Sequence, residues 1–215
     1  MKGVTRGAGG FMFAAAALMT AALVACGPGE RRGDIKVSML VGGAEQGAAG
    51  GWTALKLNDA ISAAARVRTG EDAMIDLAIF EHAGLRLLAK SEVDLTAVTG
   101  DDIHLKFDDG NILMKVGRLE KGRRLRVETP TAVASIRGTQ FWGQVRKEGK
   151  AGTFAVREGS IEITMKKTSK TVTLKAGEAL DYSADQAVLE TRSAKVAEIE
   201  AMSQIDGIRL PASVK

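Results

Sequence analysis

Apolar and polar residues alternate along most of the chain from residue 35 onward, in short runs separated by turn signals. Clear examples lie at residues 74–79, 103–107, 112–116 and 161–165, where every second side chain is apolar. A period of two is typical of β-strands that bury one face. Because the runs are short and recur roughly every ten residues, they predict an all-β fold of the sandwich, barrel or short solenoid type.

Two glycine-containing segments interrupt this pattern. Residues 42–51, GGAEQGAAGG, lack the Lys-Ser/Thr ending of a phosphate-binding loop, and no helix clearly follows them, so we expect a mobile loop. Residues 108–111, DDGN, separate two alternating runs. Asp-Gly and Gly-Asn steps favour the positive φ values of a tight reversal, so this segment predicts a hairpin or a corner.

The C-terminal part of the chain, residues 186–215, has a different period. Val196, Ile199, Met202 and Ile205 recur at steps of three, with charged residues between them, and Ser193 precedes them as a potential cap. This spacing predicts one amphipathic helix in a C-terminal helical extension. We expect the helix to pack on the β-domain or to cover a sheet edge, and the alternative is a helix that binds a partner or a membrane surface.

The N-terminal segment has the features of an export signal. Lys2 and Arg6 precede an apolar run at residues 11–25, which is shorter than the roughly 20 residues of a permanent membrane-spanning helix. The run ends in Leu-Val-Ala-Cys, which resembles the lipobox of bacterial lipoproteins, where the cysteine thiol receives a diacylglycerol. We therefore expect a lipoprotein signal peptide at residues 1–25 with a signal helix, and lipid attachment at Cys26. The alternative is an ordinary signal peptide followed by an idle cysteine.

Residues 26–34 lack periodicity and contain glycines and a proline, which predicts a tether. At about 3.5 Å per residue the tether spans no more than about 30 Å, so the folded domain would lie close to its membrane. Gly27 follows the cysteine, where an aspartate would suggest retention at the inner membrane. We expect the periplasmic face of the cell envelope, with the outer membrane favoured.

The charge balance gives little support to nucleic-acid binding. The chain has 30 Lys and Arg against 26 Asp and Glu, and the signal removes two basic residues and no acid. The basic residues are mixed with acids rather than gathered on one stripe, so we expect no nucleic-acid partner. One basic cluster stands out at residues 121–126, KGRRLR. It is interpreted as a solvated turn between strands or as a contact for an anionic lipid or polyanion.

A charged residue and a glycine interrupt an otherwise strand-like segment at residues 129–145. Pro130 disfavours a helical Thr129, so the chain enters this segment extended. Gly138 predicts a bulge or corner, where a Cβ atom would clash. We expect Arg137 to donate to carbonyl groups freed at the bend and Thr139 to contribute a hydroxyl group.

The sequence VETPTAVASIRGTQFWGQV, residues 127–145, resembles the signature of the FecR family of bacterial envelope proteins. The matching positions are Thr129, Pro130, Arg137, Gly138, Thr139 and Phe141, which we expect to be structural. The resemblance extends from about Ile35 to about Tyr182, and we assign a FecR-like β-domain to residues 35–185. It implies a β-sandwich or β-helix that serves as a sensing or interaction module outside the cytoplasm.

The resemblance does not carry over every family property. In the regulators that name the family, a cytoplasmic segment binds a sigma factor, and a transmembrane helix connects this segment to the sensing domain. A lipobox stands in their place here, so we do not expect sigma-factor regulation. Residues 81–84, EHAG, also stand where the family usually has an aspartate-glycine turn.

Catalysis, cofactors and a metal site are not expected. His82 and His104 are far apart in sequence and are expected to be exposed strand or turn residues. The acidic pairs at residues 101–102 and 108–109 lie beside glycines, where aspartate is favoured for conformational reasons. No Gly-x-Ser-x-Gly motif is present.

Three hypotheses about function follow. The first is a lipid-anchored, non-catalytic binding or sensing module, whose partner is an envelope protein or a cell-wall polymer bound through β edges or loops. The second is a structural component of a larger envelope assembly. The third is a polysaccharide hydrolase with an acid pair that the sequence does not reveal.

Overall fold

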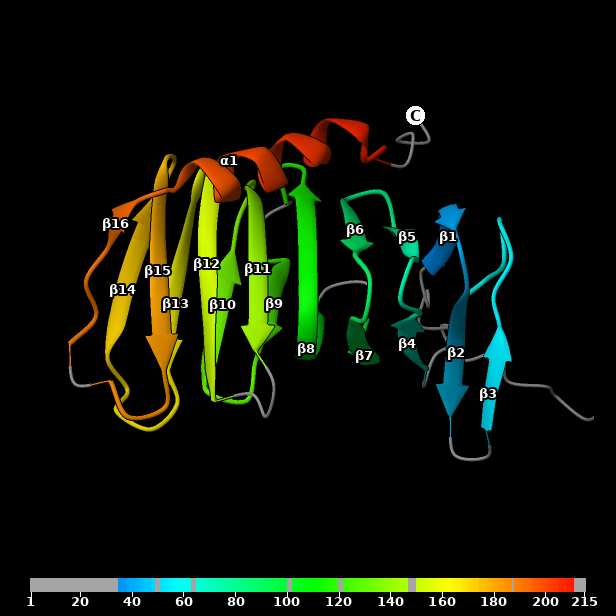
Figure 1. Ribbon diagram of the computed structural model, residues 1–215, viewed down its shortest axis with the longest axis horizontal. Helices are drawn as coiled ribbons and strands as arrows, with labels where there is room; N and C mark the ends of the chain where they lie inside the picture. The colour runs from blue at the N-terminus through cyan, green and yellow to red at the C-terminus, as the bar shows by residue number, and fades with distance from the viewer. Residues whose placement is uncertain are drawn as a thin grey trace, which may run out of the picture.

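The computed structural model describes residues 35–48, 51–62, 65–99, 102–119, 122–146, 150–186 and 188–210. These residues form a mostly β structure with one C-terminal α-helix (Figure 1), which confirms the predicted β-rich class. The predicted signal peptide, Cys26 and the tether lie outside the described residues.

The strands form a continuous sheet of two halves, here called sheet A and sheet B, which share strand β8. In spatial order, sheet A contains β1 (Ile35–Val41), β5 (Met74–Ile79), β6 (Ala83–Leu87), β8 (Asp102–Val116), β11 (Gln140–Arg146), β12 (Ala151–Glu158), β15 (Glu178–Ser183) and β16 (Arg192–Ser193). Sheet B contains β3 (Gly51–Ala54), β2 (Ala44–Ala48), β4 (Arg66–Thr69), β7 (Glu92–Val98), β8, β9 (Arg124–Glu128), β10 (Ala132–Ile136), β13 (Ser160–Met165) and β14 (Thr171–Lys175).

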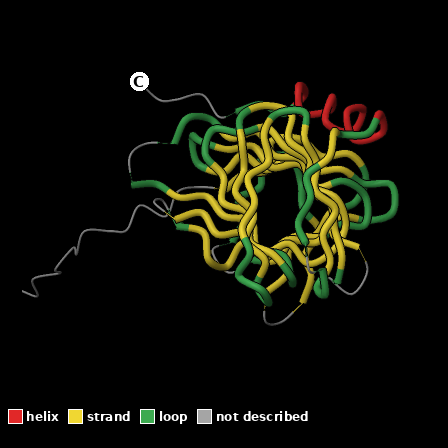
Figure 2. Tube along the Cα trace, turned by 90° about the vertical axis from the view of Figure 1, so that its left-hand side faces the viewer, coloured by secondary structure: helices red, strands yellow, loops and turns green. Residues whose placement is uncertain are grey.

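The chain adds strands to the two sheets alternately and in pairs. Strands β5 and β6 join sheet A, β9 and β10 join sheet B, β11 and β12 join sheet A, and β13 and β14 join sheet B. The pairing of β8 with β9 is parallel, and the other named pairs are antiparallel. Seen along the row of strands, the two sheets surround a common interior (Figure 2).

Strand β8 passes through the segment where a hairpin or a corner was expected. The hairpin is wrong, because β8 continues through residues 108–111, and the corner is correct. The strand pairs with β7 up to Asp109 and with β6 from Ile112, so it changes sheets there. Gly110 has φ +99°, and a Cβ atom on it would collide with Ser91. Glycine therefore bends the strand without reversing it.

The mobile loop predicted at residues 42–51 is also wrong in part, because Ala44–Ala48 and Gly51–Ala54 form the paired strands β2 and β3. Gly47 lies under the ring of Trp52, and a Cβ atom on it would be 2.7 Å from Trp52 Cε3. Arg68 covers the same ring with its guanidinium carbon 3.9 Å from the ring centroid. Gly47 thus makes room for an aromatic residue on the neighbouring strand.

The main core lies between the two sheets and contains alternating side chains from both. Phe107, Phe141 and Phe154 are among its largest fully buried members. The ring of Phe154 lies between Phe141, at 6.2 Å, and Tyr182, at 5.3 Å between centroids. The period of two in the sequence therefore identifies the core face of the strands that alternate, such as β9, β10 and β13.

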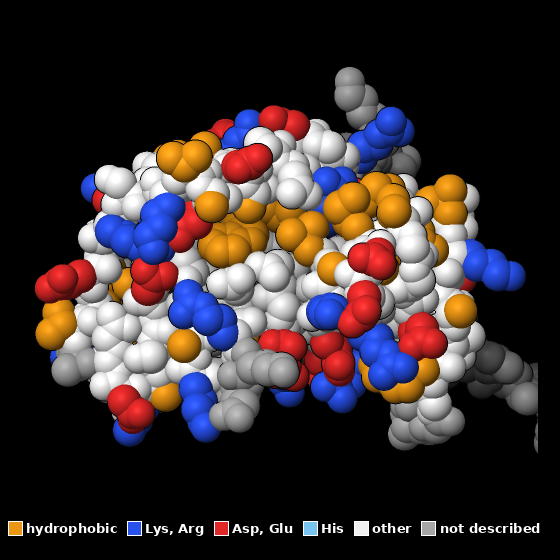
Figure 3. Space-filling view, in the orientation of Figure 1, with side chains coloured by type: hydrophobic (Ala, Val, Ile, Leu, Met, Phe, Trp, Pro, Cys, Tyr) orange, Lys and Arg blue, Asp and Glu red, His pale blue; other side chains and the backbone are white. Residues whose placement is uncertain are grey.

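Helix α1 (Val196–Ser203) and the following 3₁₀ turn η2 (Gln204–Gly207) cross the outer face of sheet A (Figure 1). Met202 and Ile205 are buried there, together with Leu113 and Trp142. The predicted apolar stripe is wrong in its first half, because Val196 is 82% and Ile199 56% exposed. Ser193 does not cap the helix but lies in β16. Figure 3 shows apolar side chains along the border between the helix and the sheet.

Candidate functional site

The Arg137-Gly138-Thr139 segment is a corner that carries the chain from β10 in sheet B to β11 in sheet A. Gly138 has φ +64°, a left-handed conformation that favours glycine. Thr139 is buried, and its hydroxyl group donates a hydrogen bond of 2.8 Å to the Ser160 carbonyl oxygen. The backbone oxygen of Thr139 accepts from Val116 N at 3.0 Å. The corner is therefore closed by bonds to the neighbouring strands.

Thr129 and Phe141 also have structural surroundings. Thr129 is 1% exposed, and its Oγ1 accepts a hydrogen bond of 3.0 Å from the Ala132 amide. The Thr129 amide in turn donates to the Ala132 carbonyl oxygen at 2.8 Å, which closes the turn around the exposed Pro130. Phe141 is fully buried in the core.

Arg137 differs from the expectation that it would bond to carbonyl groups at the bend. Its side chain is exposed and has no hydrogen-bond or ion-pair partner among the described residues. The physical reason is that carbonyl oxygens at the bend already have other partners. That of Thr139 accepts from Val116 N, and that of Arg137 lies 3.3 Å from the Thr139 hydroxyl oxygen. The guanidinium group is left available for a ligand and lies where two surface grooves meet.

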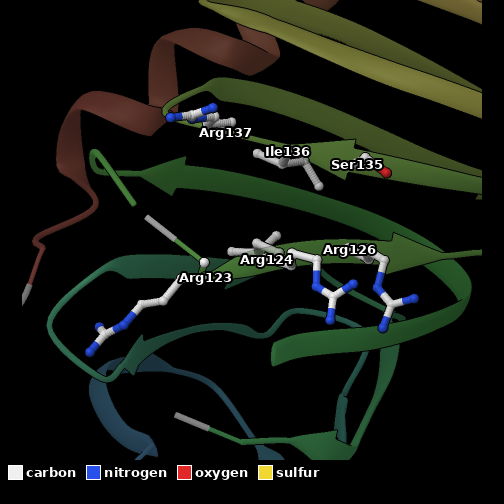
Figure 4. Close-up of a pocket in the computed structure, with 8 residues that line it drawn as sticks. Arg123, Arg124, Arg126, Ser135, Ile136 and Arg137 are labelled. Carbon is white, nitrogen blue, oxygen red and sulfur yellow. The ribbon is translucent and has the colours of Figure 1, made fainter. Parts of the chain in front are cut away.

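The first groove, here called the arginine groove, has a volume of about 330 Å³ and lies on the outer side of β9 and β10. It is lined by Gly122, Arg123, Arg124, Leu125, Arg126, Ser135, Ile136 and Arg137. Figure 4 shows the side chains of Arg124 and Arg126 lying side by side, whereas Arg137 lies at the corner after β10 with its side chain directed away from them. Among the described residues, the lining therefore contains four guanidinium groups and no carboxylate.

The strand pattern explains this arrangement. Leu125 and Val127 of β9 are buried, so Arg124 and Arg126 lie on the opposite, outer face. Ser135 pairs with Arg126 across the sheet and is exposed. A small side chain at this position, next to two long ones, leaves the surface hollow.

The four arginines are not equally available. Arg126 donates to Asp102 Oδ2 at 2.7 Å, and Arg123 lies 3.8 Å from Glu81 Oε1. Arg124 and Arg137 are exposed and form no ion pair within the described part of the chain. The groove thus combines two arginines that are held in place with two that are free to bind an anion.

The second groove, of about 540 Å³, adjoins the arginine groove at Arg137 and is lined by Lys115, Val116, Gly117, Arg118, Arg137, Gly138, Gln140, Glu158 and Leu210. Its one carboxylate, Glu158, accepts a hydrogen bond from Gln140 Nε2 at 2.6 Å. Lys115 donates to the Ile208 carbonyl oxygen at 3.2 Å, so it also anchors the C-terminal segment. Arg137 connects the two grooves into one basic surface.

The comparison with protein families agrees with the corner and its surroundings. Residues 65–162 match the FecR protein family. This FecR region contains the six signature residues and the whole arginine groove. The match begins thirty residues after the point expected from the resemblance at Ile35, so strands β1 to β3 lie outside it.

The FecR region also belongs to a fold seen in solved structures. Two crystal structures of a "putative anti-sigma factor" from Parabacteroides distasonis ATCC 8503, at 1.65 Å and 2.50 Å resolution, are each 17% identical to this chain with a TM-score of 0.55. The similarity covers 65% of this chain and 64% of that protein. At this identity the likeness shows the fold alone. No curated protein matches the sequence.

The two histidines do not form a site with each other. His82 is buried rather than exposed as expected, with Nε2 3.3 Å from Glu81 Oε1. His104 lies on β8 with Nε2 2.6 Å from Glu128 Oε2. Glu128 also accepts from Lys166 Nζ at 2.5 Å, and this hydrogen bond, followed by that to His104, holds the pKa of Glu128 below its usual value.

Two of the four aspartates considered for acid–base chemistry are engaged in other contacts. Asp102 pairs with Arg126, and Asp108 Oδ2 lies 3.7 Å from Arg66. Asp101 lies outside the described residues. Among the residues that the structure describes, no group of three His, Cys, Asp or Glu side chains has the arrangement of a metal site. No helix in the described ranges is long and apolar enough to span a membrane.

The basic cluster at residues 121–126 and the Arg-Gly-Thr corner were separate features of the sequence, and their proximity was missed. The pairing of β9 with β10 brings Arg124, Arg126 and Arg137 to one surface. The alternation in RLRV already predicts that both β9 arginines share a face. Nothing in the sequence specifies which strand lies beside β9.

Proposed function

We propose that this chain is a non-catalytic binding or sensing module of the bacterial cell envelope, anchored by a lipid on Cys26. The observation that carries the proposal is the FecR match at residues 65–162, in a region whose basic surface has unpaired arginines. The apolar run at residues 11–25 and the lipobox that ends it support the anchor and the export. Gly27 supports the outer membrane.

A binding role suits the chemistry of the basic surface better than a catalytic role. General acid–base or nucleophilic catalysis needs a base or nucleophile next to the bound substrate. Arginine serves neither purpose, because its guanidinium group stays protonated. The part of the arginine groove that the structure describes has no carboxylate, histidine or cysteine in its lining, which disfavours the alternative of a polysaccharide hydrolase.

A protein partner has a second possible contact at the edge of sheet B. Strand β3 is the last strand of that sheet and is exposed along its length. Unpaired backbone groups on an edge strand can accept an additional strand from another chain. This edge and the arginine groove are the two surfaces we propose for contacts with an envelope protein or a cell-wall polymer.

The anchor is tested by labelling cells that express the full chain with a palmitate analogue and separating their inner and outer membranes. We expect label on the wild type, none on Cys26→Ala, and recovery of the wild type in the outer membrane. The Gly27→Asp variant keeps the cysteine and is expected to move to the inner membrane. An unlabelled wild-type chain in the soluble fraction would contradict the proposal.

The binding role is tested by crosslinking the full chain in cells and purifying it from detergent-solubilised envelopes. Discrete partners that are lost from a variant with a changed groove or β3 edge would support a binding module. Stoichiometric co-purification that both variants retain would instead favour the alternative of a structural component in an envelope assembly.

A further inference from the structure

The arginine groove is the strongest unassigned feature of the molecule. Its two unpaired arginines, Arg124 of β9 and Arg137 of the corner after the neighbouring strand β10, are both exposed. Its other two, Arg123 and Arg126, are half-buried and lie against Glu81 and Asp102. These acids offset two of the four positive charges, which leaves the charges of Arg124 and Arg137 without a counter-charge among the described residues.

The spacing of the arginines favours a ligand with more than one anionic group. Arg124 and Arg126 are two residues apart on one strand, which places their Cα atoms about 6.6 Å apart. Arg137 approaches from β10 and continues into the second groove with Arg118 and Lys115. A single small anion would contact one end of this surface and leave the other cations unpaired.

Phosphate fits these donors better than carboxylate. One guanidinium group pairs both oxygens of a carboxylate, whereas a terminal phosphate has three acceptor oxygens and carries up to two charges. A phosphate group can therefore accept from two arginines at once, and Ser135 adds a hydroxyl group at the base of the groove. The groove volume of about 330 Å³ is within the range of sites for small ligands and headgroups.

The lining also argues against a nucleic acid. Proteins that bind single strands combine basic grooves with aromatic side chains on which bases stack. The described residues that line the arginine groove and the second groove include no Phe, Tyr or Trp. The recognition chemistry on this surface is thus charge and hydrogen bonding without a stacking platform.

We propose that the arginine groove binds a ligand with at least two phosphate groups, with Arg124 and Arg137 as the main contacts and Arg126 and Ser135 as supporting donors. This inference deepens the proposed binding function and rests on it, because it names the ligand chemistry of the basic surface. The phosphates belong to a soluble polyphosphate or to an anionic lipid headgroup, and these two sources share the same recognition chemistry.

The test is isothermal titration calorimetry on the full chain in neutral detergent at low salt. Sodium tripolyphosphate probes the soluble source, and short-chain cardiolipin, which carries two phosphate groups, probes the lipid source in comparison with short-chain phosphatidylcholine. We expect binding of tripolyphosphate or of cardiolipin, but not of phosphatidylcholine. Binding should weaken as salt is raised, because the arginines are exposed and screened.

Two variants with the same change in net charge separate the groove from a general charge effect. Arg124→Gln/Arg137→Gln removes the two unpaired cations, and Lys56→Gln/Lys175→Gln removes two exposed cations elsewhere. We expect the first to weaken binding at least about tenfold and the second to leave it within about twofold. Ser135→Glu, which adds a carboxylate at an exposed position, should also weaken binding.

Three results would overturn the inference: no binding of either anionic probe, equal weakening in both double variants, or phosphatidylcholine binding equal to that of cardiolipin. Failure of the inference differs from failure of the proposed function. If neither probe binds but envelope partners are still captured, the module stands and its ligand chemistry is different. Unchanged circular dichroism of each variant provides the check on folding.

Discussion

At the residue scale, two glycines allow two turns of the chain to pack closely together at the Arg-Gly-Thr corner. Gly138 and Gly159 both have positive φ, and a Cβ atom on Gly159 would lie 2.6 Å from the Gly138 carbonyl oxygen and 3.0 Å from Thr139 Oγ1. The turn between β12 and β13 thus packs directly against the corner between β10 and β11. A side chain at residue 159 would push apart the Thr139–Ser160 hydrogen bond that joins them.

This contact leads to a prediction with a matched control. Gly159 (φ +80°) and Gly177 (φ +83°) have the same backbone strain when replaced, but a Cβ atom on Gly177 meets nothing within 4 Å. We expect Gly177→Ala to cost about 1 to 2 kcal/mol of unfolding free energy from backbone strain alone. Gly159→Ala should cost a further 1 to 3 kcal/mol or so, because backbone atoms must move. Urea denaturation measures both, and equal losses would show that the close approach is unimportant.

A buried ion pair gives a second prediction at this scale. Arg86 and Asp76 are 6% and 3% exposed, and two hydrogen bonds of 2.6 and 2.7 Å join their side chains. Arg86→Met leaves the Asp76 carboxylate buried without a partner, so we expect a loss of about 3 to 5 kcal/mol.

The control for Arg86 is Asp76→Leu/Arg86→Met, which removes both charges. We expect the double variant to be more stable than Arg86→Met, because no buried charge is left uncompensated. Guanidinium chloride would screen the charges, so urea unfolding is the appropriate measurement. A double variant that is less stable than the single variant would contradict the reasoning.

The residue scale also shows what the sequence could and could not predict about the site. Gly138 and Thr139 were predictable, because a glycine between a strand and an aromatic residue indicates a bend and a neighbouring hydroxyl group can close it. The role of Arg137 was not, because the Thr139 carbonyl oxygen at the bend accepts its hydrogen bond from Val116 in β8, which is distant in sequence.

At the element scale, helix α1 is attached to sheet A by both apolar contacts and cations. Arg192 of β16 bonds to Asp181 on β15 and to Glu198 on α1, with hydrogen bonds between 2.6 and 3.0 Å. Arg157 donates to the Met202 carbonyl oxygen at 3.2 Å, and Arg86 donates to that of Gln204 at 2.9 Å. Arg157 and Arg86 lie on strands of the sheet. The C-terminal end of the helix, where the last carbonyl groups lack helical partners, therefore faces positive charge.

The Arg192 cluster predicts a pH dependence of stability. The hydrogen bond from Arg192, supported by Thr153, lowers the pKa of Asp181 from 3.8 to about 2, and Arg192 likewise lowers the pKa of Glu198. A carboxylate with a lowered pKa in the folded state stabilises the fold above its unfolded pKa and loses this effect as the pH falls. The contribution of Asp181 is therefore lost between pH 3.8 and about 2.

The measurement compares the wild type with Asp181→Asn in urea at several pH values. Since the Asp181 side chain is 46% exposed, we expect the variant to be less stable by only about 1 kcal/mol near neutral pH. The difference should shrink as the pH approaches 2. A difference that stays constant down to pH 2 would contradict the assignment.

The elements were predictable where one strand face is buried, and less so elsewhere. Residues 74–79 and 161–165 alternate in the sequence, and both form strands. Residues 44–48 do not alternate, because Gly47 takes the place of a side chain under Trp52. The helix was found from its spacing, but Glu198 rather than Val196 or Ile199 faces inward, because it meets Arg192 on the sheet.

At the scale of the whole molecule, β8 joins the two sheets, and the helix covers only one of them. The interior between the sheets is formed without the helix, by side chains of both sheets. The outer face of sheet A has its own apolar cluster, with Leu113, Trp142, Ala155 and Ala179 beneath Met202, Ile205 and Ile208. The chain therefore has one core that the β-domain completes by itself and a second that the C-terminal segment completes.

This division predicts the effect of truncation. Removing residues 194–215 should leave the strands folded, because the inter-sheet core is intact, but should expose the apolar patch on sheet A. We expect a retained β-type circular dichroism spectrum, increased binding of a hydrophobic dye and self-association in light scattering. Loss of the β spectrum would show that the two cores are not separable.

The β-rich class and the position of the FecR region could be predicted from strand periodicity and the signature residues. The sharing of β8 by two sheets could not be predicted. The choice between a hairpin and a corner at residues 108–111 depends on Gly110 lying against Ser91, which directly precedes β7 and is distant in sequence. The arginine groove depends in turn on β9 lying between β8 and β10.

The chain contains two tryptophans, and the fold gives them contrasting environments. Trp142 is 8% exposed beneath the C-terminal segment, whereas Trp52 is 37% exposed on the hairpin at the far end of the sheet. The emission of Trp142 should shift to longer wavelength when the C-terminal segment detaches, while Trp52 already emits from a polar environment. Replacing Trp52 by phenylalanine would therefore leave a single tryptophan, whose emission, excited selectively at wavelengths where tyrosine does not absorb, reports on the C-terminal segment alone.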